Sequence, residues 1–325
     1  MSNEMNNETH KHRIDRISAW AHAWKWTAIA LLVVLVSTQV FGWNIQLMAR
    51  GQYMAMTYRD RQLVEFVVPR AGAIIPVKWG DLGKQLVDAG VIDIAKFEEL
   101  YASRGGIPDE QRALLTGVKT TGSDAIAKDL GLGNDVIIMN GENAGMWLNL
   151  LWAFGLGNKN GILEEGLMVT ASSGDASGFA STGGWPVATG NVMDHYSAHP
   201  FVTLTVDQQE LVARVAAGTY RPCCDNPTHF PDCNHGMAIL GLLELMAAQG
   251  ASEDEMYRAA LWVNSYWFPD TYLTLAKYFA ERGVAWEDVD PKTVLSSVYS
   301  SASGYQQVLA EIRPVQYNQG GSCGI

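Results

Sequence analysis

The chain has 325 residues, of which 48% are hydrophobic and 18% charged, so it can bury the core of one large domain or two smaller ones. Its formal net charge is −11 at pH 7, and no run of lysines or arginines occurs in it. Both features argue against nucleic acid as a partner, because binding to a phosphate backbone needs clustered positive charge.

An uncharged apolar segment near the N-terminus predicts a membrane anchor. Residues 26–48 lie in the stretch WTAIALLVVLVSTQVFGWNIQLMA, and about 20 apolar residues span a bilayer as a helix. Tryptophans stand at both of its ends, where their rings favour the headgroup region. A cleaved signal peptide is the alternative. The long segment before the apolar run, and the lack of an A-x-A-like cleavage site, favour an uncleaved signal anchor.

The positive charges beside this segment predict its orientation. Lys11, Arg13, Arg16 and Lys25 precede it, and cytoplasmic flanks of membrane helices are rich in such residues. We therefore expect residues 1–25 in the cytoplasm and the main domain outside it. The sequence thus predicts a single-pass membrane protein, with the membrane as a partner through its own anchor.

The rest of the chain predicts a mainly α fold, with an α-rich extracytoplasmic domain of two lobes. Residues 50–169 form the expected N-terminal helical lobe, and residues 192–325 form the expected C-terminal α-rich lobe. Residues 170–191 between them are rich in Gly, Ser and Thr, which is typical of a long loop or linker. Segments with the alternating pattern of a strand are few.

Local signals mark several of these helices in chain order. Gly90 and Gly105 are expected to end two short helices, and Pro108 to open a third. The stretch NAGMWLNLLWAFGLGNKNGIL reads as an apolar helix that ends in glycines. Thr205 and Ser252 are each followed three residues later by Gln or Glu, which is the spacing of a capping box at a helix start.

The stretch NVMDHYSAHP presents two histidines four residues apart. With Asn191 as a cap and Pro200 as a stop, His195 and His199 would share one face of a short helix. This spacing is a familiar way to present two imidazoles to a metal ion. A pair of surface or core histidines is the more frequent outcome of the same spacing.

The densest chemical signal is RPCCDNPTHFPDCNHGM, which holds three of the four cysteines and two of the seven histidines. Its prolines predict a turning loop that leads into a helix. With Asp232 as the expected N-cap of that helix, Cys233 and His235 fall in the first turn. Backbone N–H groups and the helix dipole there favour a thiolate.

Three thiols and one imidazole in this motif form a potential ligand set. Cys223, Cys224, Cys233 and His235 give the pattern C-C-x8-C-x-H, and Cys3His suits zinc while the same soft donors suit copper(I). Adjacent cysteines in an extended segment point to opposite faces, so both reach one ion only if the turn folds them around it. His229, in the same stretch, is a further candidate ligand.

Two other uses of these cysteines stay open at this point. The fourth one, Cys323, lies in a glycine-rich tail and can complete a metal site, pair with another cysteine or react with a partner. Four cysteines in an exported chain also fit two structural disulfides. A thiol oxidoreductase, with Cys233 as nucleophile and Cys223 or Cys224 resolving it, is the third reading.

Residues 205–325, and above all YRPCCDNPTHFPDCNHGMA, NSYWFPDTY and YSSASGY, resemble a family of uncharacterised membrane-anchored prokaryotic proteins with P-C-C and D-C-N-H-G segments. A looser similarity connects them with small exported proteins that carry a P-C-Y-C-G-C motif. The resemblance implies that the segment is one unit and implies no known activity. The sequence as a whole predicts a membrane-tethered protein that binds copper or zinc outside the cytoplasm, for metal handling or in service of another envelope protein.

Overall fold

The computed structural model describes residues 58–103, 105–117 and 136–317, which belong to one compact unit. The predicted cytoplasmic segment and anchor, together with Cys323, lie outside the described residues. Within those ranges, no helix combines the length and the apolar character that crossing a bilayer requires.

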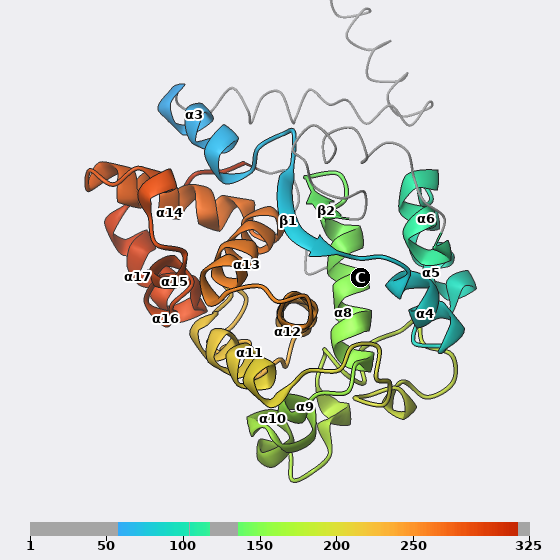
Figure 1. The fold of residues 1–325 in the computed structure, drawn as a ribbon. Coiled ribbons are helices and arrows are strands. Elements are labelled where there is room, and N and C mark those ends of the chain that lie inside the picture. Colours follow the sequence, from blue (N-terminus) through green and yellow to red (C-terminus); the bar gives the residue numbers. More distant parts are fainter. Residues whose placement is uncertain (1–57, 104, 118–135, 318–325) are drawn as a thin grey trace, which may run out of the picture. The chain divides into compact units, whose positions relative to one another are not determined.

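The described chain is mainly helical, as predicted, with one small sheet (Figure 1). The helices are α3 (Tyr58–Val67), α4 (Leu82–Asp88), α5 (Ile94–Ala102), α6 (Asp109–Thr116), α8 (Ala144–Gly157), α9 (Gly161–Glu165), α10 (Leu167–Ala171), α11 (Val206–Gly218), α12 (Asn234–Ala248), α13 (Glu253–Trp267), α14 (Pro269–Glu281), α15 (Pro291–Val294), α16 (Ser297–Ser300) and α17 (Ala302–Glu311). Single 3-10 turns occur at η1 (Ala176–Gly178), η2 (Val192–Asp194) and η3 (Trp286–Asp288).

The sheet pairs two strands that lie far apart in the sequence. Strand β1 (Ala73–Lys78) runs antiparallel to β2 (Val136–Met139), and Ala73 faces Met139 across the ladder. The pairing is irregular between Ile75 and Lys78. One side of this sheet meets the helices, because β1 contacts both α12 and α13.

Helix starts follow the local signals of the sequence. Thr205 caps α11 and Ser252 caps α13, each through a complete capping box with the Gln or Glu three residues later. Pro108 precedes α6, and Asp290 with Pro291 opens α15. Caps of this kind are local, since one side chain satisfies backbone N–H groups only two or three residues away.

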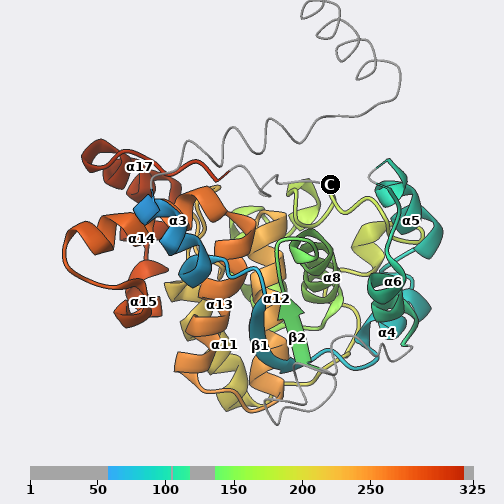
Figure 2. The ribbon, with the colours of Figure 1, turned by 90° about the horizontal axis from the view of Figure 1, so that it is seen from above.

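Helices α8 and α12 cross in the centre of the unit with their backbones in contact. A Cβ atom on Gly155 would lie 2.3 Å from the Met237 carbonyl oxygen, and one on Gly241 would lie 2.6 Å from that of Leu151. In both views α12 lies between α8 and α13 (Figure 1, Figure 2). The predicted N-terminal and C-terminal lobes therefore meet along α8 and α12, and this contact places the start of α12.

The segment 170–191 is mostly irregular, as expected, but it packs against the core. The Trp185 indole is buried and donates to the Val91 carbonyl at 2.8 Å. The Trp152 indole, on α8, donates to the Ser181 carbonyl at 2.7 Å. The Ser181 N–H in turn donates to the Asp232 carbonyl at 3.2 Å. The segment thus connects α8 with the loop that carries the Cys/His motif.

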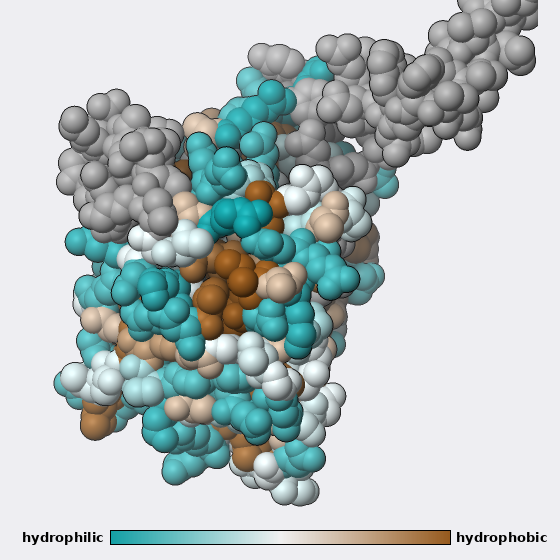
Figure 3. All heavy atoms as spheres, turned by 90° about the vertical axis from the view of Figure 1, so that its right-hand side faces the viewer, coloured by the Kyte–Doolittle hydropathy of each residue, from teal (hydrophilic) through white to brown (hydrophobic). Residues whose placement is uncertain are grey.

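The face on the side of α4, α5 and α6 is mostly hydrophilic, with hydrophobic side chains gathered near its centre (Figure 3). Elsewhere, large hydrophobic side chains are exposed singly on separate elements, such as Phe66 on α3, Leu167 on α10 and Val206 on α11. Hydrophobic residues exposed one at a time are common in folded domains and require no partner.

Candidate metal centre

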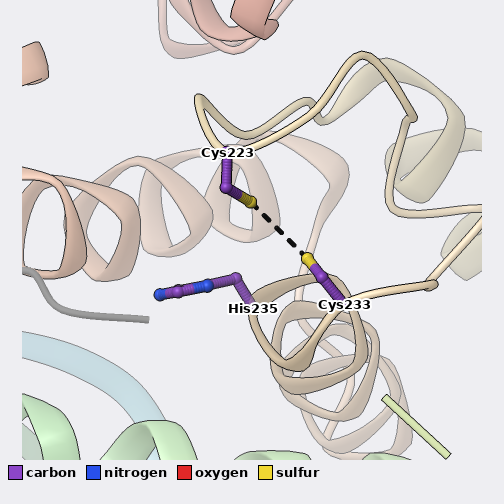
Figure 4. A group of neighbouring side chains, drawn as sticks. All are labelled: Cys223, Cys233 and His235. Carbon is purple, nitrogen blue, oxygen red and sulfur yellow. Dashed lines mark hydrogen bonds between the residues drawn. The ribbon is translucent and has the colours of Figure 1, made fainter. Parts of the chain in front are cut away.

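The Cys/His motif surrounds the N-terminus of α12. Cys233 is the N-cap of this helix, and its Sγ accepts a hydrogen bond from the Gly236 N–H at 3.4 Å. Figure 4 shows the Cys223 and Cys233 side chains pointing toward each other, with His235 extending from the first helical turn. A sulfur at this position lies at the positive end of the helix dipole, where negative charge is stabilised.

The prediction that Asp232 caps α12 is wrong by one residue. The Asp232 carboxylate instead binds the Arg221 guanidinium at 2.5 Å and accepts from the Asn226 side-chain amide at 2.8 Å. With the carboxylate held inside the loop, the next residue takes the cap position. Cys233 is therefore closer to the helix end than the sequence indicated.

Arg221 is the organising residue of the loop, and sequence reasoning missed it. Its side chain is fully buried, and its Nε donates to the Cys233 Sγ at 3.0 Å. Its remaining N–H groups donate to the carbonyl oxygens of Asn226 at 2.8 Å and Phe230 at 3.1 Å, besides Asp232. A buried cation needs such partners, so this residue fixes the loop around the sulfur.

The absence of a side chain at Gly236 makes room for this guanidinium. A Cβ atom there would lie 2.6 Å from both Cζ and Nη2 of Arg221. Such an approach is too close for any side chain, and the contact joins the loop to the first turn of α12. The signal for this arrangement was present in the sequence as an arginine directly before P-C-C and a glycine directly after N-H.

The chain turns at Pro222 and brings the adjacent cysteines to one place. The Cys224 N–H donates to the Arg221 carbonyl at 3.4 Å, which closes the turn. The Cys223 and Cys233 sulfurs are 3.5 Å apart. The Cys224 Sγ lies 3.9 Å from the Asn226 carbonyl oxygen. All three described cysteines are free thiols.

These side chains form two overlapping groups of potential ligand atoms. Cys223, Cys233 and His235 have theirs within 4.8 Å of one another, and so have Cys224, Asp232 and Cys233. Cys233 belongs to both groups, so the four predicted ligands of the motif lie together. This cluster could hold a metal ion.

His235 is the buried member of the cluster. Its side chain is 1% exposed and packs between aromatic rings, with the Phe268 centroid 4.4 Å and the Trp267 centroid 5.6 Å away. Among the described groups, none forms a hydrogen bond with its Nδ1. Buried imidazole nitrogens are nearly always satisfied, so an imidazole with an unpartnered nitrogen and a ring nitrogen within 4.8 Å of two sulfurs fits a metal ligand.

The three thiols differ in how readily they ionise. Hydrogen bonds from the Cys223 and Cys224 thiols, together with the Arg221 charge, hold the pKa of Cys233 well below its usual range. The hydrogen bonds with Cys224 and Cys233 raise the pKa of Cys223. For Cys224, the bond with Cys223 lowers the pKa, but the bond with Cys233 and burial outweigh it and raise the pKa. The first thiolate therefore forms at Cys233.

His195 and His199 contact each other and belong to neither of these groups. Asn191 caps η2 as predicted, but the expected short helix is only a 3-10 turn. The His195 Nδ1 lies 3.1 Å from the His199 Nε2, and the His195 Nε2 lies 2.9 Å from the Thr189 carbonyl oxygen. The carbonyl can only accept, so His195 carries its hydrogen on Nε2 and the neutral pair is joined by the proton of His199.

The arrangement of the two imidazole rings is that of a direct hydrogen bond between them. Their centroids are 5.4 Å apart. This equals about the 3.1 Å between the His195 Nδ1 and the His199 Nε2 plus the radius of each ring, so these two nitrogens point at each other. Burial, and then the nearby His195, lower the pKa of His199. The imidazoles thus share one proton, and metal binding by this pair stays a prediction.

The remaining sequence candidates are His229 and Cys323. His229 donates its backbone N–H to the Ala216 carbonyl at 3.1 Å, and its side chain is in neither ligand group. Cys323 lies outside the described residues, so its role as a ligand stays a prediction.

Comparison of the chain with protein-family models, with curated proteins and with solved structures finds no match. The resemblance of residues 205–325 to membrane-anchored proteins therefore stays an expectation.

Proposed function

We propose that this chain is a metal-binding protein that holds copper(I) or zinc through Cys223, Cys224, Cys233 and His235. One observation carries the proposal. Sulfur and imidazole ligand atoms lie within 4.8 Å of one another at a helix N-terminus, and the imidazole is buried with its Nδ1 unpartnered among the described groups.

The donor set and its charges suit a soft or borderline cation. Three thiolates and a neutral imidazole leave one net negative charge around zinc and two around copper(I). The Arg221 guanidinium beside Cys233 is already paired with Asp232, so it offsets only part of any excess. Because uncompensated buried charge is costly, this balance favours zinc of the two ions.

The proposed role is metal handling outside the cytoplasm, or service to another envelope protein. The exposure of Cys223 supports this role, because an exposed ligand can be approached by a ligand of a second protein while Cys233 and His235 stay in place. The predicted anchor at residues 26–48 would keep the site at the membrane surface.

Elemental analysis of the full-length chain tests the proposal. The chain is purified under reducing, anaerobic conditions, first without added metal and then after exposure to zinc or copper(I). We expect one ion per chain, and a loss of at least about tenfold in affinity for Cys233→Ser and His235→Asn, as for removal of a direct ligand or its supporting contacts.

His229→Asn is the matched control, because it removes the other histidine of the same motif. We expect this variant to bind metal as the parent does. Thermal unfolding of each variant separates lost binding from lost folding. A parent chain that takes up neither ion, or a His235→Asn variant that binds with unchanged affinity, would show that the cluster is not the site.

A further inference from the structure

The Cys223 and Cys233 sulfurs are arranged for a reaction with each other. They lie 3.5 Å apart, whereas a disulfide bond is about 2.05 Å long, so a closure of about 1.5 Å would join them. Cys223 lies in a turn of the loop and is exposed. The partner that moves is therefore the one on irregular backbone, while Cys233 stays fixed at the helix cap.

Cys233 is the sulfur on which donors converge. The Arg221 Nε donates to it at 3.0 Å, and the Gly236 N–H donates at 3.4 Å. Groups that donate to a sulfur stabilise its nucleophilic form. The residue is only partly covered, so a small oxidant can reach it from solvent.

Cys224 is placed differently, although it is adjacent to Cys223 in sequence. Its sulfur lies within 4.8 Å of the Cys233 sulfur but is directed toward the Asn226 carbonyl oxygen at 3.9 Å, whereas the Cys223 sulfur is 3.5 Å from that of Cys233. The geometry thus favours Cys223 over Cys224 as the resolving thiol.

We propose that Cys233 and Cys223 form a redox pair, in which hydrogen peroxide oxidises Cys233 and Cys223 converts the product into a disulfide. The Cys233 sulfur attacks the peroxide and takes one oxygen, which gives a sulfenic acid and one water. The Cys223 sulfur then attacks the Cys233 sulfur, the S–O bond breaks and a second water leaves. The two thiols lose two electrons and two protons, which reduce one peroxide to two waters, and a dithiol reductant restores them.

The disulfide would withdraw two ligands from the metal cluster. A bound ion would then keep only Cys224 and His235 of the motif and would be released. This consequence rests on the proposed metal function, whereas formation of the disulfide does not.

Peroxide treatment of the reduced, metal-free, full-length chain tests the pair. Mass spectrometry of unreduced peptides is expected to find the Cys223–Cys233 disulfide in the parent chain and in the Cys224→Ser control. In Cys223→Ser, a sulfenic acid should accumulate on Cys233, where dimedone traps it. In Cys233→Ser, oxidation of the remaining thiols should slow by at least about tenfold, the difference expected between an activated and an ordinary thiol.

Several results would overturn the pair. One is that the main disulfide formed contains Cys224 or Cys323. Another is that dimedone traps a sulfenic acid on Cys223 instead of Cys233. The third is that peroxide oxidises the thiols of Cys233→Ser as fast as those of the parent chain. Circular dichroism of each variant before treatment establishes that the comparison is made on folded chains.

A second arm with the zinc-loaded chain separates this inference from the metal function. A chromogenic chelator should record one zinc released for each disulfide formed. A disulfide in a chain that takes up neither zinc nor copper(I) would support the redox pair and contradict the metal function. Stoichiometric zinc in a chain that forms no Cys223–Cys233 disulfide would contradict the redox pair alone.

Discussion

The Arg221 guanidinium and the Cys233 sulfur form a charge-assisted hydrogen bond of 3.0 Å, in which the arginine side chain is fully buried. The bond connects two residues that are 12 positions apart, and it closes the loop that carries Cys223 and Cys224. A buried guanidinium is costly unless every contact is made, so the properties of the sulfur and the stability of the loop depend on each other.

The first prediction concerns the space beside this guanidinium. Gly236→Ala places a methyl group against Arg221, so we expect the free energy of unfolding to fall by about 1–3 kcal/mol, as for other overpacked sites. Denaturant unfolding measures the change. Gly145→Ala is the control, because Gly145 also lies in the first turn of a long helix but has open space around its Cβ position. Equal stability of the two alanine variants would contradict the close contact.

The second prediction concerns ionisation of the thiols in the metal-free chain. Because the pKa of Cys233 is lowered, one thiolate should already be present at pH values where the other thiols are protonated. A pH titration of thiolate absorbance should show this early step in the parent and in Cys224→Ser. The step should be absent from Cys233→Ser. An early step that survives in Cys233→Ser would assign the thiolate to another residue.

The third prediction concerns Glu244, a carboxyl group in the middle of α12 that is 0% exposed. Its Oε2 accepts from the Asn158 side-chain amide at 2.6 Å, and burial raises its pKa well above 4.5. The unfolded chain thus releases this proton at a lower pH than the folded chain. The protonated carboxyl therefore gives its full stability below about pH 4.5, and stability is lost as the pH rises through the folded pKa.

Glu244→Gln removes this titration and keeps the shape of the side chain. We expect the variant to gain stability over the parent as the pH rises, by about 1.4 kcal/mol for each unit by which the folded pKa is raised. Measuring the free energy of unfolding at a series of pH values checks this gain. Glu281→Gln is the control, because Glu281 is exposed. A difference between Glu244→Gln and the parent that does not change with pH would count against a protonated carboxyl in the core.

The fourth prediction concerns the crossing of α8 and α12. A methyl group on Gly241 would meet the Leu151 carbonyl oxygen, which belongs to a backbone and cannot rotate away. Gly241→Ala should therefore destabilise the fold by about 1–3 kcal/mol, although alanine is the better helix former. Thermal unfolding beside the Gly145→Ala control measures it. Retention of full stability would mean that the two backbones are farther apart.

The parts of this structure that the sequence predicted are the local ones. Capping boxes at Thr205 and Ser252 involve atoms three residues apart, so their signal is contained in a short window. The proximity of Cys223, Cys224, Cys233 and His235 follows from their closeness along the chain, once prolines exclude regular structure between them.

The parts that sequence reasoning missed depend on contacts between distant residues. Strand β1 pairs with β2 some 60 residues later, and neither strand has a sharp alternating pattern. Arg221 reads as an ordinary surface charge until Asn226, Phe230 and Asp232 enclose it. The shift of the helix cap from Asp232 to Cys233 follows from that enclosure.

The hydrogen bonds from Trp152 to Ser181 and from Ser181 to Asp232 couple the ligand loop to a core helix. Under the proposed metal function, coupling through these bonds is reciprocal, so that ion binding and the order of residues 170–191 would change each other by the same free energy. A second protein that docked on this segment and drew Ser181 away would lower the affinity for the ion without touching a sulfur. Residues 170–191, whose composition suggests a passive linker, would then be an allosteric surface that controls release of the ion.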